Sequence, residues 1–414
     1  MRRWQWALQL LTRRMWFRAG LFCVFAVALA LASAFAGHLI SYDLAAKIGS
    51  KSVDSILNLL ASSMLAVTTF SLTAMVQAYS GATSTITPRA VQLLVDDSTS
   101  QNALATFLGS FLFAIVGIIA LSTGIYGETG RVILFGGTIF VIGLIVITFL
   151  RWIEHVTRFG RMADTIARVE KAAAQSVRGM TQRLSFAAFD TARPDDAVLV
   201  HHTEIGRITH VDLAELSDVA DAAGASVHVL SLPGMLADPA HPLVWTKASL
   251  DDQQVEQVRE AFTIQHDRAF DHDPRFALVV LGEIASRALS PAVNDPGTAI
   301  AVIEAGTRVL ATMLRHEPKE KTADTAGVIV PRIAFPDLIE DLFRPIARDG
   351  AALIEVGIRL QKALATLSAI EPQSTARCRT EAQDALSRAC AAFTSSADAD
   401  ALTRLHEQLW RQES

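Results

Sequence analysis

The segment Ile56–Tyr79 reads ILNLLASSMLAVTTFSLTAMVQAY, and it decides how the first part of the chain is interpreted. It is long enough to cross a bilayer, whose apolar core of about 30 Å needs about 20 helical residues. Because polar groups in hydrocarbon need hydrogen-bond partners, we expect this helix to pack against other helices or to border a wet path. The polar residues that interrupt the segment are Asn58, Ser62, Ser63, Thr68, Thr69, Ser71, Thr73 and Gln77.

Three other stretches are also long and apolar enough to span a membrane: Trp16–Ile40, Leu104–Tyr126 and Val132–Trp152. The first has a basic front, as a signal peptide does, but its apolar run exceeds the roughly 7–15 residues of a signal sequence, which favours an uncleaved span. Charged residues make up only 19% of the chain and become dense after about Leu150. The sequence therefore predicts an α-helical membrane protein with four transmembrane helices, followed by a water-soluble tail.

The distribution of Lys and Arg predicts the orientation of these spans. Five arginines lie before or at the start of the first span, and five basic residues lie at or after the end of the fourth, between positions 151 and 171. The loop between the first two spans has only Lys47 and Lys51, and the loop between the last two has only Arg131. We therefore expect both termini, and the loop Ser80–Ala103, in the cytoplasm. A net charge of -5 gives no reason to expect a nucleic-acid partner.

The polar residues of Ile56–Tyr79 recur mainly at spacings of three, four and seven, which places them on one stripe of a helix. Two interpretations stay open: the stripe packs against neighbouring helices, or copies of it line a polar path around the axis of an oligomer. No Asp, Glu, Lys, Arg or His lies in the middle of a span, which argues against a proton relay. The stripe residues selected as candidates are Asn58, Ser62, Thr69, Thr73 and Gln77.

The water-soluble tail is predicted to be α+β and mostly helical. We expect a transmembrane domain at 1–152, a helical stalk at 153–190, a small α/β module at 191–247 and a mostly helical cytoplasmic domain at 248–414. Asp212 and Gly224 are typical of the start and end of a helix in the module. Ser249 with Asp252 predicts a helix that continues to about Phe270.

Two places outside the spans are candidates for binding. Arg287, Asn294, Asp295 and Thr298 surround a break between two helices, where free N–H groups favour an anionic ligand or the carboxylate of a partner protein. The alternative is structural: Asp295 caps the second helix, Asn294 completes the turn and Arg287 pairs with an acid. Arg89 follows the second span and is expected to bind lipid phosphate, to couple the loop to the tail, or to lie at the interface as an ordinary basic residue.

Metal and catalytic motifs are not evident in the sequence. The histidines near positions 201–210 and the segment 266–273 match no common zinc spacing, and the three cysteines show no disulfide or metal pattern. Nucleophile elbows, phosphate-binding glycine loops and dinucleotide fingerprints are missing. We therefore predict no metal site, no cofactor and, on balance, no enzyme.

Two segments carry a resemblance to a known family: TTFSLTAMVQAYSGATSTITPR in and after the second span, and RALSPAVNDPGTA at Arg287–Ala299. With them the chain resembles the bacterial family of predicted inner-membrane proteins called domain of unknown function 2254. The segments Gly206–Ile208, Pro233–Gly234 and Asp267–Pro274 fit the same pattern in order, with Ala277 in place of the usual glycine. The resemblance implies a multi-pass protein of the bacterial inner (plasma) membrane and supplies no mechanism.

Two functions follow as hypotheses. The first is a homo-oligomeric, channel-like protein in the lipid bilayer, with the polar second helix lining the path and the cytoplasmic tail regulating it. The alternative is a membrane-anchored sensor or scaffold whose tail binds a protein or a small anionic ligand.

Overall fold

The computed structural model describes residues 50–85, 87–95, 97–123, 128–158, 161–180, 184–186, 193–316 and 327–411, with isolated positions between 17 and 28. Apart from those isolated positions, the predicted first span Trp16–Ile40 lies outside the described residues. The chain divides into a unit that contains residues 4–84 and 91–161 and a C-terminal unit that contains residues 85–90 and 162–414. Each unit is described by itself.

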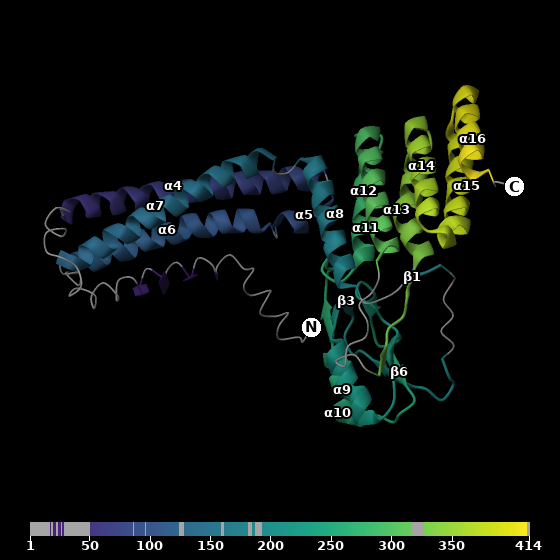
Figure 1. Ribbon diagram of the computed structural model, residues 1–414, viewed down its shortest axis with the longest axis horizontal. Helices are drawn as coiled ribbons and strands as arrows, with labels where there is room; N and C mark the ends of the chain where they lie inside the picture. The colour runs from purple at the N-terminus through teal and green to yellow at the C-terminus, as the bar shows by residue number, and fades with distance from the viewer. Residues whose placement is uncertain are drawn as a thin grey trace. The chain divides into compact units, whose positions relative to one another are not determined.

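The first unit is built from three long helices that run side by side (Figure 1): α4 (Ser50–Thr85), α6 (Ser98–Ser122) and α7 (Glu128–Arg158). Within them, three segments have the length and composition of a membrane span: Val53–Gly81, Thr99–Ser122 and Val132–Val156. These coincide with three of the four predicted spans. The helices share one apolar core, whose most deeply buried members include Leu57, Phe107, Phe113, Leu134 and Val141.

A fourth helix long and apolar enough to cross a membrane, α12 (Pro296–Leu314), lies in the C-terminal unit. It packs against α8, α11 and α14, and it carries Glu304 and Arg308. Arg308 pairs with Glu170 at 2.7 Å, and Glu304 pairs with Arg359 at 3.2 Å. The apolar composition of α12 is thus accounted for by its place among other helices of a folded bundle.

The predicted stalk at 153–190 takes a different form. Helix α7 ends at Arg158, and a separate helix, α8 (Met162–Gly179), follows. Ile166, Val169, Ala173 and Val177 are buried at helical spacing, because α8 packs against α11 and α12. The segment 153–190 is thus helical over much of its described length, and small apolar residues on one face of α8 seat that helix in the bundle.

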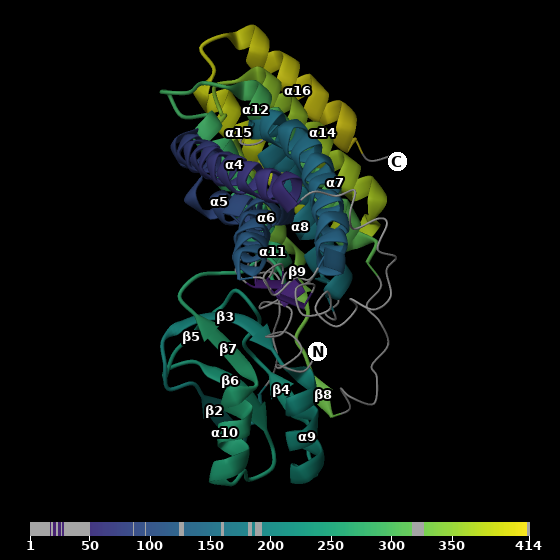
Figure 2. The same ribbon diagram turned by 90° about the vertical axis from the view of Figure 1, so that its left-hand side faces the viewer.

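The α/β part contains two antiparallel or mixed sheets (Figure 2). One has the order β2-β6-β4-β8 and the other β5-β3-β7. Helices α9 (Leu213–Ala223) and α10 (Asp252–Glu260) pack beside them, α9 beginning at Asp212 and ending at Gly224 as predicted. The strands are β2 (Val198–His201), β3 (Gly206–Val211), β4 (Val227–Val229), β5 (Leu236–Ala237), β6 (Pro242–Thr246), β7 (Phe262–Gln265) and β8 (Val328–Ile329).

Two strands of these sheets come from beyond residue 247, where the mostly helical domain was expected to begin. The helix predicted from Ser249 to about Phe270 is shorter: Asp251 and Gln254 form the capping box, and α10 ends at Glu260. The chain then forms β7, which pairs with β3, while β8 runs parallel to β4. Local capping signals could not reveal these long-range pairings.

The remaining helices form a bundle at the C-terminal end of the chain. Two segments pair as short parallel strands beside it, β1 (Leu184–Ser185) and β9 (Ile333–Ala334). The helix α11 packs on both α12 and α13, and α14 packs on α15 and α16. The bounds are α11 (Pro274–Ala288), α13 (Phe335–Asp349), α14 (Ile354–Ile370), α15 (Thr375–Ala392) and α16 (Ser396–Trp410), with a 3-10 turn at Pro372–Ser374.

Candidate functional site

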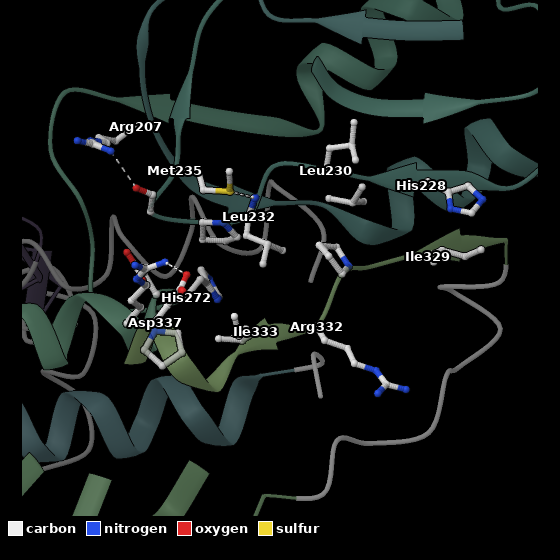
Figure 3. Close-up of a pocket in the computed structure, with 18 of the residues that line it drawn as sticks. Arg207, His228, Leu230, Leu232, Met235, His272, Ile329, Arg332, Ile333 and Asp337 are labelled. Atoms are coloured by element: carbon white, nitrogen blue, oxygen red, sulfur yellow. Dashed lines mark hydrogen bonds and ion pairs between the residues drawn. The ribbon is translucent and has the colours of Figure 1, made fainter. Parts of the chain in front are cut away.

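A cavity of about 970 Å³ lies in the C-terminal unit and has walls from the sheets, from α11 and from α13 (Figure 3). Ligand pockets in proteins commonly measure about 300–1,000 Å³. Strand β3 contributes Arg207, the chain after β4 contributes Leu230 to Met235, and the start of α11 contributes Asp273 and Arg275. The cavity therefore has the size and the mixed lining of a binding site for a small molecule.

Five basic and three acidic side chains line the cavity. Arg268 pairs with Asp273 at 2.7 Å, and Arg275 pairs with the two acids of α13 that line the cavity, Asp337 at 2.9 Å and Asp341. These pairs use all three carboxylates. Among the residues that the structure describes, the other three cations have no carboxylate partner: Arg207, Lys247 and Arg332. The lining thus keeps a positive balance after its internal pairs are counted.

Asp273 is the best-buried charged group at the cavity. Its carboxylate caps the N-terminus of α11 by accepting a hydrogen bond from the backbone N–H of Phe276 at 3.0 Å. It accepts a second hydrogen bond from Arg268 Nε at 2.8 Å. Burial raises the pKa of Asp273 even though Arg268 opposes the shift. Gly234 has a positive φ of 92°, and a Cβ atom there would overlap the Asp273 carboxylate. The turn at Pro233–Gly234 therefore needs glycine both for its backbone and for this close approach.

Aromatic rings form part of the wall on the side of the four-stranded sheet. His228 of β4 and Trp245 of β6 are paired across the strands, and their rings stack with centroids 3.6 Å apart and planes 14° apart. Ile329 of β8 is paired with His228 from the other side. Figure 3 shows His228 and Ile329 on neighbouring strands at one end of the lining. Three adjacent strands thus place one row of flat and apolar side chains at the cavity.

The predicted stripe of α4 lies on the surface of the first unit. Asn58, Ser62, Thr69, Thr73 and Gln77 are all exposed, whereas Leu57, Met64 and Met75 are buried. With about 100° of rotation per residue, the five polar residues occupy about 100° of arc, opposite the buried face. The stripe is therefore turned away from the other helices of its own unit that the structure describes.

The stripe's hydroxyls find partners within their own helix. Ser62 Oγ donates to the carbonyl of Asn58, and Thr69 and Thr73 donate to the carbonyls four residues earlier, all at 3.0 Å. Asn58 Nδ2 donates to the Asp54 carbonyl at 3.0 Å, whereas Gln77 makes no side-chain hydrogen bond to any residue described. The three stripe hydroxyls therefore have acceptors within their own helix, a solution that the requirement for hydrogen-bond partners alone did not predict.

The turn between α11 and α12 brings Asp295 and Thr298 together. Asp295 accepts hydrogen bonds from the backbone N–H and the hydroxyl of Thr298, at 3.0 and 2.6 Å, and these bonds lower its pKa. Asn294 adopts a left-handed backbone with φ of 49°. The carboxylate of Asp295 thus already occupies the helix N-terminus, so that anion binding by Arg287, Asn294 and Thr298 stays a prediction.

Arg89 lies at the start of α5 (Pro88–Val95) and forms an ion pair with Glu283 of α11. Arg89 belongs to the segment 85–90, which is part of the C-terminal unit although it follows the membrane helix α4 directly. The three roles expected for Arg89 stay predictions, and the ion pair with Glu283 is a contact within the C-terminal unit. In the part of the chain described here, no three His, Cys, Asp or Glu side chains are grouped to hold a metal ion.

The cavity was not identified from sequence, although several of its residues had been noticed. Arg207, the Pro233–Gly234 turn, Arg268 and Asp273 all belong to segments quoted for the family resemblance, and the last two also to the segment 266–273 that was considered as a metal site. They come from separate segments of the sequence, and the folding of the sheets onto α11 brings them to one place. The one shared signal in these segments is a single Arg beside a turn or a helix start. No rule based on neighbouring residues predicts that such distant arginines lie around one cavity.

A protein-family model described as "Predicted membrane protein (DUF2254)" matches residues 12–366. The chain is also 28% identical over 152 residues to uncharacterized proteins of Mycobacterium bovis (Mb1321c) and Mycobacterium tuberculosis (Rv1290c). Each of these alignments covers 34% of this chain and 29% of the relative, so the chain spans under a third of the curated relatives that it matches. No solved structure matches the chain.

Proposed function

We propose, from the premise that this chain belongs to the DUF2254 family of predicted membrane proteins, that it works as a homo-oligomer in which copies of α4 line a polar path. The observation that carries the proposal is the outward position of Asn58, Ser62, Thr69, Thr73 and Gln77 on one chain. The stripe hydroxyls have acceptors within α4, but the Gln77 amide has no side-chain hydrogen bond to any described residue, and the same stripe of a second copy supplies a polar partner for it.

The chemistry of the stripe favours passive permeation. Exposed hydroxyls that keep their i−4 hydrogen bonds still offer lone pairs to a passing solute, as a polar lining requires. The predicted spans have no ionisable residue near their centres, so they offer no side chain that would carry a proton across the membrane during transport. We further propose that both termini lie in the cytoplasm of a bacterial inner membrane, as the distribution of Lys and Arg favours.

Cross-linking tests whether the stripe forms the subunit contact. In a background without native cysteines, Ser62→Cys and Thr73→Cys are expected to give covalent dimers with a short bifunctional maleimide in native membranes. Phe70→Cys is the matched control, because Phe70 is 72% exposed but lies beside the stripe. Equal cross-linking at all three positions, or none at the stripe, would contradict the proposal.

Flux measurements test the path itself. Purified protein in liposomes should pass small ions or solutes, and Thr69→Val with Thr73→Val should reduce that flux, since valine keeps the shape and removes the hydroxyls. The control replaces Leu72 by Val on the neighbouring apolar face, where Leu72 is 50% exposed. Flux that is unchanged in the double variant would refute a lining role for these threonines.

A further inference from the structure

We propose that the cavity of the C-terminal unit binds a nucleotide-like ligand, that is, a planar ring that carries a phosphate. This inference does not depend on the path through the membrane. It rests on the row of side chains at the sheet, on the surplus of cations and on the apolar surface between them, and each is argued in turn.

The row at the sheet supplies a surface for a planar ring. Trp245 is only 7% exposed and supports the half-buried His228 ring, which lines the cavity together with it. Aromatic and heteroaromatic rings stack favourably on such a surface, and each stacked base contributes binding without a sequence-specific hydrogen bond. Ile329, paired with His228 in the sheet, extends the same row with an aliphatic side chain.

Two cations flank this row. Lys247 lies in the bend directly after β6 and lines the cavity together with Trp245, and Arg332, three residues after Ile329, lines it as well. Both are exposed, and neither makes an ion pair with any residue that the structure describes. Free cations beside an aromatic surface favour a ligand that combines a ring with a phosphate group.

The rest of the lining fits the body of such a ligand. Figure 3 shows Leu232, Ile333 and His272 between the end that bears Arg207 and the end that bears His228. Five basic against three acidic residues give the lining a formal charge of +2, with histidines counted as neutral (5 − 3). A phosphate monoester carries a charge of about −1.5 to −2 at neutral pH, which complements that balance.

Calorimetric titration of the full chain in detergent with AMP tests the proposal. AMP is expected to bind, and adenosine, ribose 5-phosphate and inorganic phosphate are each expected to bind at least about tenfold more weakly, because adenosine lacks the phosphate and the other two lack the planar ring. The double variant Lys247→Gln, Arg332→Gln should weaken AMP binding by at least about tenfold, and so should His228→Ala. Lys362→Gln, an exposed cation on α14, should change nothing.

Three results would overturn the proposal. They are the absence of AMP binding, equal binding of ribose 5-phosphate and AMP, and unchanged affinity in the double variant. Because Lys247 and Arg332 are exposed, their replacement should leave the melting temperature unchanged, which separates lost binding from lost folding. The flux and cross-linking experiments on α4 test the path through the membrane, whereas the titration with AMP tests the cavity. Failure of one proposal therefore does not contradict the other.

Discussion

Replacing Gln361 by methionine should release helix α16 from the bundle. Gln361 is fully buried in α14 and connects three elements. Its Nε2 donates to the Ala382 carbonyl at 2.7 Å, and its Oε1 lies 2.9 Å from His406 Nδ1 and 3.2 Å from Trp410 Nε1. Since an amide oxygen only accepts, His406 must carry its proton on Nδ1. Met keeps the volume of the side chain and removes all three hydrogen bonds.

The expected loss follows from the two hydrogen bonds that join Gln361 to α16, because the Ala382 carbonyl belongs to α15. A buried hydrogen bond contributes about 1 kcal/mol net, so these two contribute about 2 kcal/mol, while the matched volume keeps any packing cost small. Since about 1.4 kcal/mol is a factor of ten, the equilibrium constant for opening α16 should rise about 30-fold. The family model matches residues 12–366, so α16 lies beyond the matched residues. Gln361 therefore joins a helix outside the matched region to α14, which lies largely within it.

Amide hydrogen exchange measures this opening directly. The protection of the α16 amides should fall about 30-fold in Gln361→Met, with smaller changes in α11 and α12. Lys362→Met is the control, since Lys362 is the exposed neighbour on the same helix. The reasoning is refuted if α16 keeps its protection, or if protection falls equally throughout the C-terminal unit.

Three further predictions concern the C-terminal unit. Burial lowers the pKa of His272, so the folded unit binds fewer protons than the unfolded chain as the pH falls below about 6.5. The melting temperature should therefore drop in that pH range, and it should drop less steeply in the variant His272→Gln. Gly234→Ala should lower the melting temperature more than Gly224→Ala does. Both glycines have a positive φ, but only at Gly234 would the added Cβ atom overlap a side chain, that of Asp273. Equal losses in the two variants would exclude this overlap. Arg89→Glu should increase proteolysis of the segment 80–103, and the added substitution Glu283→Arg should restore resistance to the protease. A double variant that is as sensitive as the single one would argue against the ion pair between these two residues.

The sequence was most informative where the signal is local and long. Three apolar segments form the long helices α4, α6 and α7, because composition over about 20 residues is sufficient to predict a span. Helix ends also followed local chemistry: Asp212 and Asp295 cap α9 and α12. In both cases the decisive groups lie within a few residues of each other.

The sequence was least informative where pairing is distant. Strand β7 has only four residues, and its partner β3 lies more than 50 positions earlier, so no local alternation distinguished it from the end of a helix. The cavity has the same property, since Arg207 and Asp341 meet only after both sheets and α13 have formed. Arg275 pairs with Asp337 across more than 60 residues for the same reason.

The attachment of residues 85–90 to the C-terminal unit has a consequence for α4. Helix α4 ends at Thr85, directly before this segment, and Arg89 holds the segment to α11. The chain thus passes directly from the helix that carries the polar stripe to a segment that an ion pair fixes within the C-terminal unit. Replacing Arg89 therefore removes a contact that lies only four residues beyond the last residue of α4.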